Sequence, residues 1–296
     1  MKRINYHTHT YRCGHATGSE EDMVLAAINA NIEELGFSDH IPLPNYRKHL
    51  LKSIPYCRSI RSLLVLIRTI IKDGPGMRMP YLSMITHLKT IEESAINHYG
   101  EIKIYKGFEA EYLEEYLDYY QELLTTYQID YLILGNHFNK HCIESCYYGK
   151  KRLSKKYLYA YCNDLEKAME TNLFSYIAHP DLFMVGYTKW DADAKVVCER
   201  ICRKAKELDI PLEINGGGIR KGKVIVNGEM HYAYPNPYFW EIASQMGNKV
   251  ILGIDAHSPE DLNEEIYVQL EDFANEYHLN VVDEFEFRKG TVEYIT

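Results

Sequence analysis

The sequence predicts an α/β barrel, closed or distorted, built from seven parallel strands and the helices that connect them. Short apolar runs alternate with longer segments of helical period, which is the pattern of parallel strands joined by crossover helices. Side chains that can bind metals follow most of these runs, as expected where the carboxyl ends of barrel strands build an active site. The 296 residues, 46% hydrophobic and 25% charged, are enough for one large barrel.

The strand candidates are short apolar runs, and most of them are followed by a segment long enough for a helix. They are Ile4–His7, Glu34–Phe37, Ile102–Phe108, Tyr131–Gly135, Ser175–Ala178, Pro211–Ile214 and Val250–Ile254. Because the usual barrel of this class has eight units, a chain with seven is expected to close around fewer strands or to be distorted.

Helix candidates lie between the strand candidates. They are Glu20–Asn31, Tyr112–Tyr127, Lys155–Thr171, Ala192–Leu208, Pro237–Met246 and Pro259–Tyr277. The first follows Ser19, with Asp22 in the spacing of a capping box. The last has Ser258 as its N-cap and proline at its first helical position.

One interval, residues 42–100, breaks this alternation. It contains a basic, leucine-rich helix candidate (Ser59–Lys72), a Gly74-Pro75-Gly76 turn and a second helix candidate (Ser83–Tyr99). Because it follows a strand, it is expected to lie over the active-site end of the barrel. We therefore predict one domain, residues 1–296, with a lid or specificity insertion at about 42–100.

Composition restricts the partners and the location of the protein. The formal net charge is −9, and no basic run is long enough to follow a nucleic-acid backbone. The seven cysteines are scattered, as is typical of reduced thiols. No apolar run approaches the roughly 20 residues of a membrane span, and the polar start is unlike a signal peptide. We expect a cytoplasmic protein without a nucleic-acid or membrane partner, and its oligomeric state stays open.

Metal-type side chains fall at the ends of six of the seven strand candidates or in the loop after the first. They are His7, His9, His15, His40, Glu109, His137, His179, Asp255 and His257. The sixth strand candidate ends instead in Asn215 and three glycines. In an α/β barrel these ends converge on one face, so groups far apart in the sequence are expected to meet there.

Single motifs in this set are weak signals, and their joint arrangement carries the prediction. Alternation along a strand puts His7 and His9 on one side, roughly 7 Å apart at the backbone, and Asp255 and His257 repeat the spacing. A lone histidine such as His179 is more often a hydrogen-bonded rim residue. Seven of the 13 histidines, however, occupy strand ends or an adjacent loop, which indicates a metal cluster.

The motifs resemble those of the polymerase and histidinol phosphatase (PHP) superfamily, in its order and over nearly the whole chain. They are His7-Thr-His9, His15, Ser38-Asp39-His40, Gly107-Phe-Glu109-Ala-Glu111, His137-Phe138, His179-Pro-Asp181 and Asp255-Ala-His257. The Asn215–Lys221 segment, Tyr234-Pro235 and the long insertion are similar to those of monofunctional histidinol-phosphate phosphatases of this superfamily.

The resemblance implies a distorted seven-stranded, TIM-like (β/α)7 barrel, the PHP fold, with three divalent metal ions. By motif, the first ion takes His7, His9, Glu109 and Asp255. The second takes Glu109 as a bridge with His137 and His179, and the third takes His15, His40 and His257. This mixture of nitrogen and carboxylate ligands suits zinc, manganese or iron.

The resemblance implies hydrolysis of a small phosphorylated substrate, L-histidinol phosphate in histidine biosynthesis. No nucleophilic serine elbow or phosphate-cradling P-loop is present in the sequence, so a metal-bridging hydroxide is the expected nucleophile. The expected catalytic residues are Asp255, also as a proton acceptor or donor, His257 and Glu109. Arg220 and Lys221 are candidates for phosphate binding, and Glu111 for hydrogen bonding to a ligand or to a substrate amine.

Three alternatives stay open. The first is a related phosphoesterase acting on another small phosphomonoester, a nucleotide or phosphotyrosine, because the loop after His179 has Lys189 as its only cation where relatives of this type carry a phosphate-binding arginine. A non-catalytic metal-binding module is the second, and the complete ligand set argues against it. A proofreading exonuclease is the third, and the acidic balance argues against it.

Overall fold

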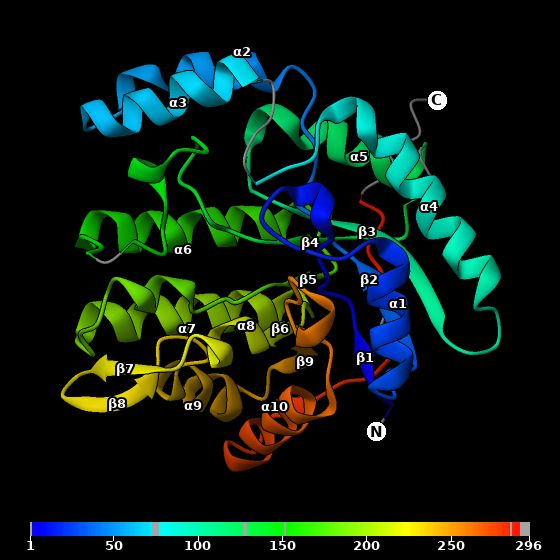
Figure 1. Ribbon diagram of the computed structural model, residues 1–296. Helices are drawn as coiled ribbons and strands as arrows, with labels where there is room; N and C mark the ends of the chain where they lie inside the picture. The colour runs from blue at the N-terminus through cyan, green and yellow to red at the C-terminus, as the bar shows by residue number, and fades with distance from the viewer. Residues whose placement is uncertain (1, 73–76, 127–128, 151, 285, 291–296) are drawn as a thin grey trace, which may run out of the picture.

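The computed structural model describes residues 2–72, 77–126, 129–150, 152–284 and 286–290. In this part of the chain, a curled parallel sheet of eight strands lies among surrounding helices (Figure 1). The strand order is β1-β2-β3-β4-β5-β6-β9-β10. The bounds are β1 Ile4–Asn5, β2 Glu34–Phe37, β3 Lys103–Ala110, β4 Tyr131–Leu134, β5 Tyr176–Ile177, β6 Leu212–Asn215, β9 Lys249–Gly253 and β10 Asn280–Val281.

The sheet separates two sets of core side chains. Along β4, Leu132 and Leu134 belong to the large core that also contains helix residues, whereas Tyr131 and Ile133 belong to a smaller cluster. The other buried members of that smaller cluster come from β1, β5, β9 and adjoining positions: Ile4, Tyr6, Tyr176, Ala178 and Ile251. Burial on both faces explains why the strands are near-continuous apolar runs rather than alternating ones.

The segments that follow β1 and β9 meet beside the curled sheet. Thr8 and Ala256 form an isolated parallel bridge, in which the Ala256 carbonyl accepts from His9 N at 2.8 Å and the Ala256 N–H donates to the carbonyl of His7 at 3.1 Å. Asn5 adds a side-chain bond, since its Oδ1 accepts from Ile254 N at 2.8 Å. The two His/Asp motifs at opposite ends of the sequence are therefore neighbours.

The predicted α/β fold with a parallel sheet is confirmed, and all seven predicted strands are present, but the strand count differs. An eighth strand, β10, pairs with β9, and its two residues are too few to produce an alternation signal. A two-stranded hairpin, β7 (Lys223–Val226) and β8 (Glu229–Tyr232), was also missed. Asn227-Gly228 at its turn, with positive φ at both residues, is a strong hairpin signal.

The helices largely match the predicted ranges. They are α1 Glu20–Asn29, α2 Tyr46–Ser53, α3 Ile60–Lys72, α4 Met84–Asn97, α5 Leu117–Thr125, α6 Lys155–Glu170, α7 Ala192–Glu207, α8 Gly216–Arg220, α9 Pro237–Met246 and α10 Glu264–Glu276. The predicted capping box of Ser19 and Asp22 is present. The predicted helix Pro259–Tyr277 is instead a 3-10 turn, Pro259–Asp261, followed by α10, whose N-cap is Asn263.

The insertion contributes α2, α3 and α4. Figure 1 shows α2 and α3 side by side at one end of the molecule, away from the strands, whereas α4 packs on β3 and α1. α2 is anchored by His49, whose Nδ1 lies 2.6 Å from the Glu115 carboxylate. The predicted Gly74-Pro75-Gly76 turn lies outside the described residues. None of the described helices is long and apolar enough to cross a membrane.

Candidate metal centre

All nine predicted metal ligands meet at one place, at the carboxyl ends of the strands. Eight of them line a cavity of about 410 Å³, and the ninth, His7, is fully buried beneath it. They follow β1, β2, β4, β5 and β9 or, for Glu109, lie near the end of β3. The convergence expected from parallel strands therefore brings together side chains as distant in sequence as His7 and His257.

Glu109 is at the centre of the cluster. Its Oε2 lies 2.9 Å from His40 Nδ1, 3.5 Å from His9 Nε2 and 3.6 Å from His7 Nε2. Its Oε1 lies 3.1 Å from His179 Nε2 and 3.5 Å from His137 Nε2. One buried carboxylate thus faces five imidazoles, an arrangement suited to a bridging ligand.

Asp255 lies close to two of these imidazoles, those of His7 and His9, and to His257. Its Oδ1 lies 3.4 Å from the Nε2 atoms of His7 and His9, and 3.4 Å from His257 Nδ1. Asp255 has φ of 55°, a backbone conformation that a non-glycine residue adopts only where the surrounding structure imposes it. Gly217 makes room here, because a Cβ at that position would lie 2.5 Å from Asp255 Oδ2.

His15 and His257 form the outer part of the cluster. Their Nε2 atoms are 3.0 Å apart, and the rings of His15 and His40 stack with centroids 5.2 Å apart. The two nitrogens face each other at a distance that suits a shared cation. His40 also contacts Glu109, so it lies between this outer pair and the inner ligands.

The donor atoms fit a cation. His7 Nε2, both ring nitrogens of His9 and His179 Nδ1 are buried and have no hydrogen-bond partner, although buried polar atoms are normally paired. Among the predicted ligands, three sets of three ligand atoms lie within 4.8 Å of one another: His7, His9 and Asp255; His7, Glu109 and His179; and His9, His40 and Glu109. A fourth such set joins His9 to Cys13 and Asp39. The His/Glu/Asp cluster is therefore suited to divalent metal ions.

The pKa values of His9, His40 and Glu109 favour the forms that bind metals. Burial lowers the pKa of His40 to about 4 and also lowers that of His9, so both imidazoles are neutral at pH 7. Burial acts to raise the pKa of the Glu109 carboxyl, but His137, His40 and His7 outweigh it and hold the value well below its usual range. Neutral imidazole and ionised carboxylate are the forms that bind metals.

The field at the base of the cluster attracts positive charge. Burial acts to lower the pKa of His7, yet the carboxylates of Glu213, Asp255 and Glu109 hold it well above its usual value. A divalent cation in contact with these carboxylates would be stabilised by the same negative charge.

Glu213, on β6, was not predicted as part of the site, because the sixth strand candidate ends in Asn215 and three glycines. It is fully buried, and its Oε1 lies 2.8 Å from His7 Nδ1. Its Oε2 accepts from His179 N at 3.1 Å and from Asn215 Nδ2 at 2.8 Å. Glu213 thus orients two predicted ligands. A charged residue inside the apolar run Pro211–Ile214 was the available signal.

Glu111 orients His137, one of the predicted metal ligands. Its carboxylate lies 3.0 Å from His137 Nδ1 and accepts from the backbone N–H groups of His137 at 2.8 Å and Phe138 at 3.3 Å. The buried guanidinium of Arg78 lies 3.5 Å from it. Of the two predicted roles, these contacts match hydrogen bonding to a ligand rather than to a substrate amine, and Glu111 does not line the cavity.

Arg220 and Lys221 both line the cavity, but both have partners within the protein. Arg220 donates to the carbonyls of Ile254 at 2.8 Å and Asp255 at 2.6 Å, and its Nε lies 3.0 Å from Asp261. It therefore holds the loop that carries Asp255. Lys221 donates to the hydroxyl of Tyr234. Phosphate binding by these two residues stays a prediction.

Asp181, from the His179-Pro-Asp181 motif, directs its carboxylate to the start of α9. Asp181 Oδ2 accepts from Asn236 N at 2.6 Å and from Trp240 Nε1 at 3.2 Å. The carboxylate therefore anchors the start of α9, and Glu213 holds the backbone of His179 instead.

Known proteins share this sequence pattern and fold. A "Probable histidinol-phosphatase" of Deinococcus radiodurans is 25% identical over 260 residues, which cover 86% of this chain and 85% of that protein. The crystal structure of a candidate histidinol phosphatase of Listeria monocytogenes matches with a TM-score of 0.67 at 20% identity, over 90% of this chain and 99% of that one.

A second solved structure is the histidinol phosphate phosphatase of Lactococcus lactis, which contains zinc, L-histidinol and phosphate. It matches with a TM-score of 0.63 at 14% identity, over 97% of each chain. Both structural likenesses show the fold. The family model described as the PHP domain matches residues 5–217, and the chain therefore belongs to the PHP domain family.

Proposed function

We propose that this protein is a metal-dependent phosphomonoesterase that hydrolyses L-histidinol phosphate to L-histidinol and phosphate. The observation that carries the proposal is the cluster of two carboxylates and seven imidazoles in and beneath one cavity. The relative from Deinococcus radiodurans carries the name of this activity, and the Lactococcus lactis protein binds zinc, L-histidinol and phosphate together.

The cluster would hold three divalent ions, zinc, manganese or iron. His7, His9 and Asp255 would hold the first. Glu109 would bridge to a second held with His137 and His179, and His15, His40 and His257 would hold a third. Such ions supply a nucleophile from water at neutral pH and offset charge on phosphoryl oxygens.

The remaining chemistry belongs to the side chains of the chain itself. Asp255 is ionised, because His7, His9 and His257 outweigh the effect of burial on its pKa, so it can accept a proton. Lys221 and Arg220 are the described cations that line the cavity, and they would bind the phosphoryl group by charge-assisted hydrogen bonds. We propose His257 and Glu109 as the further catalytic residues.

The insertion at about 42–100 would cover the cavity within a single domain of residues 1–296. Met77, from the segment between α3 and α4, lines the same cavity as the ligands. An apolar side chain at this place helps to exclude water from the reacting groups, which strengthens their electrostatic interactions.

Steady-state hydrolysis of a panel of phosphomonoesters tests the substrate. The panel contains L-histidinol phosphate, a nucleoside monophosphate, phosphotyrosine and a generic aryl phosphate, each with protein loaded separately with zinc, manganese or iron. We expect the highest kcat/KM on L-histidinol phosphate. Equal or higher kcat/KM on another member would replace the substrate and leave the phosphoesterase proposal intact.

A further inference from the structure

The wall of the metal cavity contains polar side chains besides the predicted ligands. Among the described residues they are Tyr147, Arg220, Lys221, Tyr234 and Asp261. A phosphomonoester bound at the metal ions would contact this wall. The partners that each side chain already has within the protein therefore indicate which of them is available to a substrate.

Four of these five side chains have hydrogen-bond or ion-pair partners within the protein. Arg220 and Asp261 lie 3.0 Å apart, and Arg220 also donates to two backbone carbonyls of the loop after β9. Lys221 donates to the hydroxyl of Tyr234. To bind a substrate, each of these groups would have to share or exchange its partner.

Tyr147 differs from these four, because its hydroxyl makes no hydrogen bond within the described part of the chain. Its ring, in contrast, is packed. The His137 ring lies nearly parallel to it, with centroids 6.4 Å apart and an interplanar angle of 16°, and the Phe138 ring lies at 5.4 Å. A phenol is protonated at neutral pH and can donate, and a covered tyrosine hydroxyl usually has a partner. The Tyr147 hydroxyl is thus available as a donor to a molecule in the cavity.

Backbone pairing fixes Tyr147 beside a predicted metal ligand. Phe138 and Tyr147 form an isolated antiparallel bridge, and Tyr148 N donates to the carbonyl of His137 at 2.7 Å. Gly149 leaves room for the end of the phenol, because a Cβ at that position would lie 2.7 Å from Tyr147 Oη. The position of the phenol is therefore tied to that of His137.

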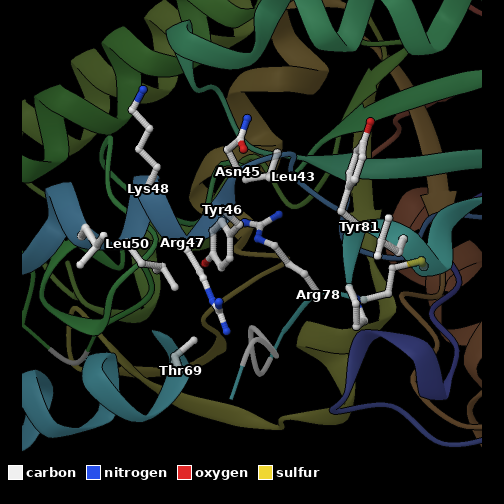
Figure 2. Close-up of a pocket in the computed structure, with 13 residues that line it drawn as sticks. Leu43, Asn45, Tyr46, Arg47, Lys48, Leu50, Thr69, Arg78 and Tyr81 are labelled. Carbon is white, nitrogen blue, oxygen red and sulfur yellow. The ribbon is translucent and has the colours of Figure 1, made fainter. Parts of the chain in front are cut away.

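A further cavity, of about 510 Å³, lies beneath the insertion (Figure 2). Arg78, buried in its wall, donates to the Ile41 carbonyl at 3.2 Å and to Cys142 Sγ at 3.4 Å. Its guanidinium also lies 5.7 Å from the centroid of the Tyr46 ring, and Figure 2 shows the two side chains next to each other. The buried cation of that cavity is engaged within the protein, whereas the Tyr147 hydroxyl is not.

We propose that Tyr147 is a substrate-binding residue of the metal centre, and that its hydroxyl donates a hydrogen bond to a phosphoryl oxygen of the bound phosphomonoester. The assignment rests on the phosphomonoesterase activity proposed above but not on the identity of the alcohol. Metal ions in such enzymes bind phosphoryl oxygens, so the anion lies beside their ligands, where the Tyr147 ring packs against His137. A hydrogen bond to an anionic oxygen is stronger than one between neutral groups.

Tyr147→Phe, which removes the hydroxyl and keeps the ring, tests the assignment in the metal-loaded protein. Calorimetric titration with inorganic phosphate should show an affinity about tenfold lower than that of the natural protein, the effect of losing one hydrogen bond to a charged group. The kcat/KM on L-histidinol phosphate should fall by about the same factor or more. Metal content should stay unchanged, because the ring still packs against His137 and Phe138.

Tyr99→Phe is the matched control, because it removes a hydroxyl from a side chain that is 91% exposed just after α4. It should change neither the phosphate affinity nor kcat/KM. Unchanged phosphate affinity in Tyr147→Phe would overturn the assignment. Loss of metal from that variant would overturn it too, since the hydroxyl would then have a structural role. So would a natural protein that binds no phosphate up to about 10 mM.

The two measured quantities separate this assignment from the proposed function. If the natural protein hydrolyses none of the phosphomonoesters in the panel but Tyr147→Phe still lowers phosphate affinity, the proposed activity is overturned and Tyr147 remains a donor to the bound anion. Turnover by the natural protein, with equal phosphate affinity in the variant, overturns the contact alone. A fall in kcat/KM with unchanged phosphate affinity has the same meaning, because the hydroxyl would then contact another part of the substrate.

Discussion

At the scale of single residues, the metal centre depends on the side chains that hold its ligands as much as on the ligands. Glu213 and Glu111 each contact a ring nitrogen of a predicted ligand, at 2.8 Å for His7 and 3.0 Å for His137. Such contacts fix the tautomer and the orientation of an imidazole. In both cases the second ring nitrogen, Nε2, is directed toward the carboxylates of the centre.

Replacement of Glu213 by glutamine tests this role. The amide keeps the shape of the side chain but presents a donor or a weaker acceptor to His7, so the affinity for metal should fall about 10–100-fold. Competition with a chelator measures it. Glu241→Gln, at an exposed position on α9, is the matched control, and equal losses of affinity in both variants would contradict the role of Glu213.

The convergence of the predicted ligands could be read from the sequence, whereas the side chains that support them could not. A histidine that follows an apolar run is visible in the sequence. Glu213 lies inside such a run, and only the curled sheet places it beside both His7 and His179. The partners of Arg220 likewise depend on contacts with residues about 35 positions away.

At the scale of elements, neighbouring strands approach closely, and glycines on them leave space for the buried carboxylates. Glu109 near the end of β3 occupies the space above Gly135, which follows β4, because a Cβ on that glycine would lie 1.9 Å from Glu109 Oε1. The same relation holds between Gly253 and Glu213, also at 1.9 Å.

Gly135→Ala should therefore displace the Glu109 carboxylate and reduce the metal content of the purified protein by more than half, with a smaller loss in thermal stability. Elemental analysis measures the first quantity and calorimetry the second. Full metal content in the variant would contradict this prediction, because it would show that the Glu109 carboxylate is not displaced from the metal centre.

Helix starts provide a separate test of local structure. The Ser19 hydroxyl accepts from Asp22 N at 3.2 Å and Asp22 bonds back to Ser19 N at 2.8 Å. Ser19→Ala should lower the free energy of unfolding by about 1 kcal/mol, as measured by urea denaturation, and leave metal affinity unchanged. A loss of metal would mean that the start of α1 also supports the loop of His15.

Two of the elements that were not predicted, β10 and α2, gave weak sequence signals for different physical reasons. β10 has two residues, too few for a periodic signal, and α2 lies in an insertion whose apolar residues, such as Leu50, pack on another inserted helix rather than on the sheet. The longer elements α6, α7 and α9 were predicted to within one residue, because each buries a continuous apolar face.

At the scale of the whole molecule, the curl of the sheet places stability and function at opposite ends of the strands. Glu34 at the start of β2 joins β1 and β3 through contacts with Tyr6, Lys2 and Lys103. Burial acts to raise the pKa of this carboxyl, but the hydrogen bonds from Lys2 and Tyr6 outweigh it and leave the pKa lowered. Its ionised form therefore stabilises the folded state.

The contribution of the ionised Glu34 carboxylate to the free energy of unfolding should be fully present above its ordinary pKa of about 4.5. It should be lost as the pH falls through the lower pKa that this carboxyl has in the folded protein. Glu34→Gln should lower the free energy of unfolding at pH 7 by about 1–2 kcal/mol, and the difference from the natural protein should shrink below pH 4.5. Urea denaturation across pH 3–7 measures both curves. A difference that grows toward low pH would contradict the assignment.

The approach of the segments that follow β1 and β9 is a long-range feature of the fold that the sequence predicted. The repeated spacing of His7/His9 and Asp255/His257 suggested a shared centre, and the Thr8–Ala256 bridge brings the two motifs together. The number of strands was harder to predict, because the pairing of a two-residue strand with β9 depends on tertiary contacts.

The central claim is that the cluster around Glu109 and Asp255 holds the metal ions on which hydrolysis depends. Its most direct test measures metal content and L-histidinol phosphate turnover together, for the purified protein, for protein depleted by a chelator, and for depleted protein reloaded with zinc, manganese or iron. Asp255→Asn, which keeps the shape of the side chain, is carried through the same series. We predict that turnover disappears with the metal, returns on reloading, and stays at least 100-fold lower in the variant. Undiminished turnover by the metal-free protein would contradict the account.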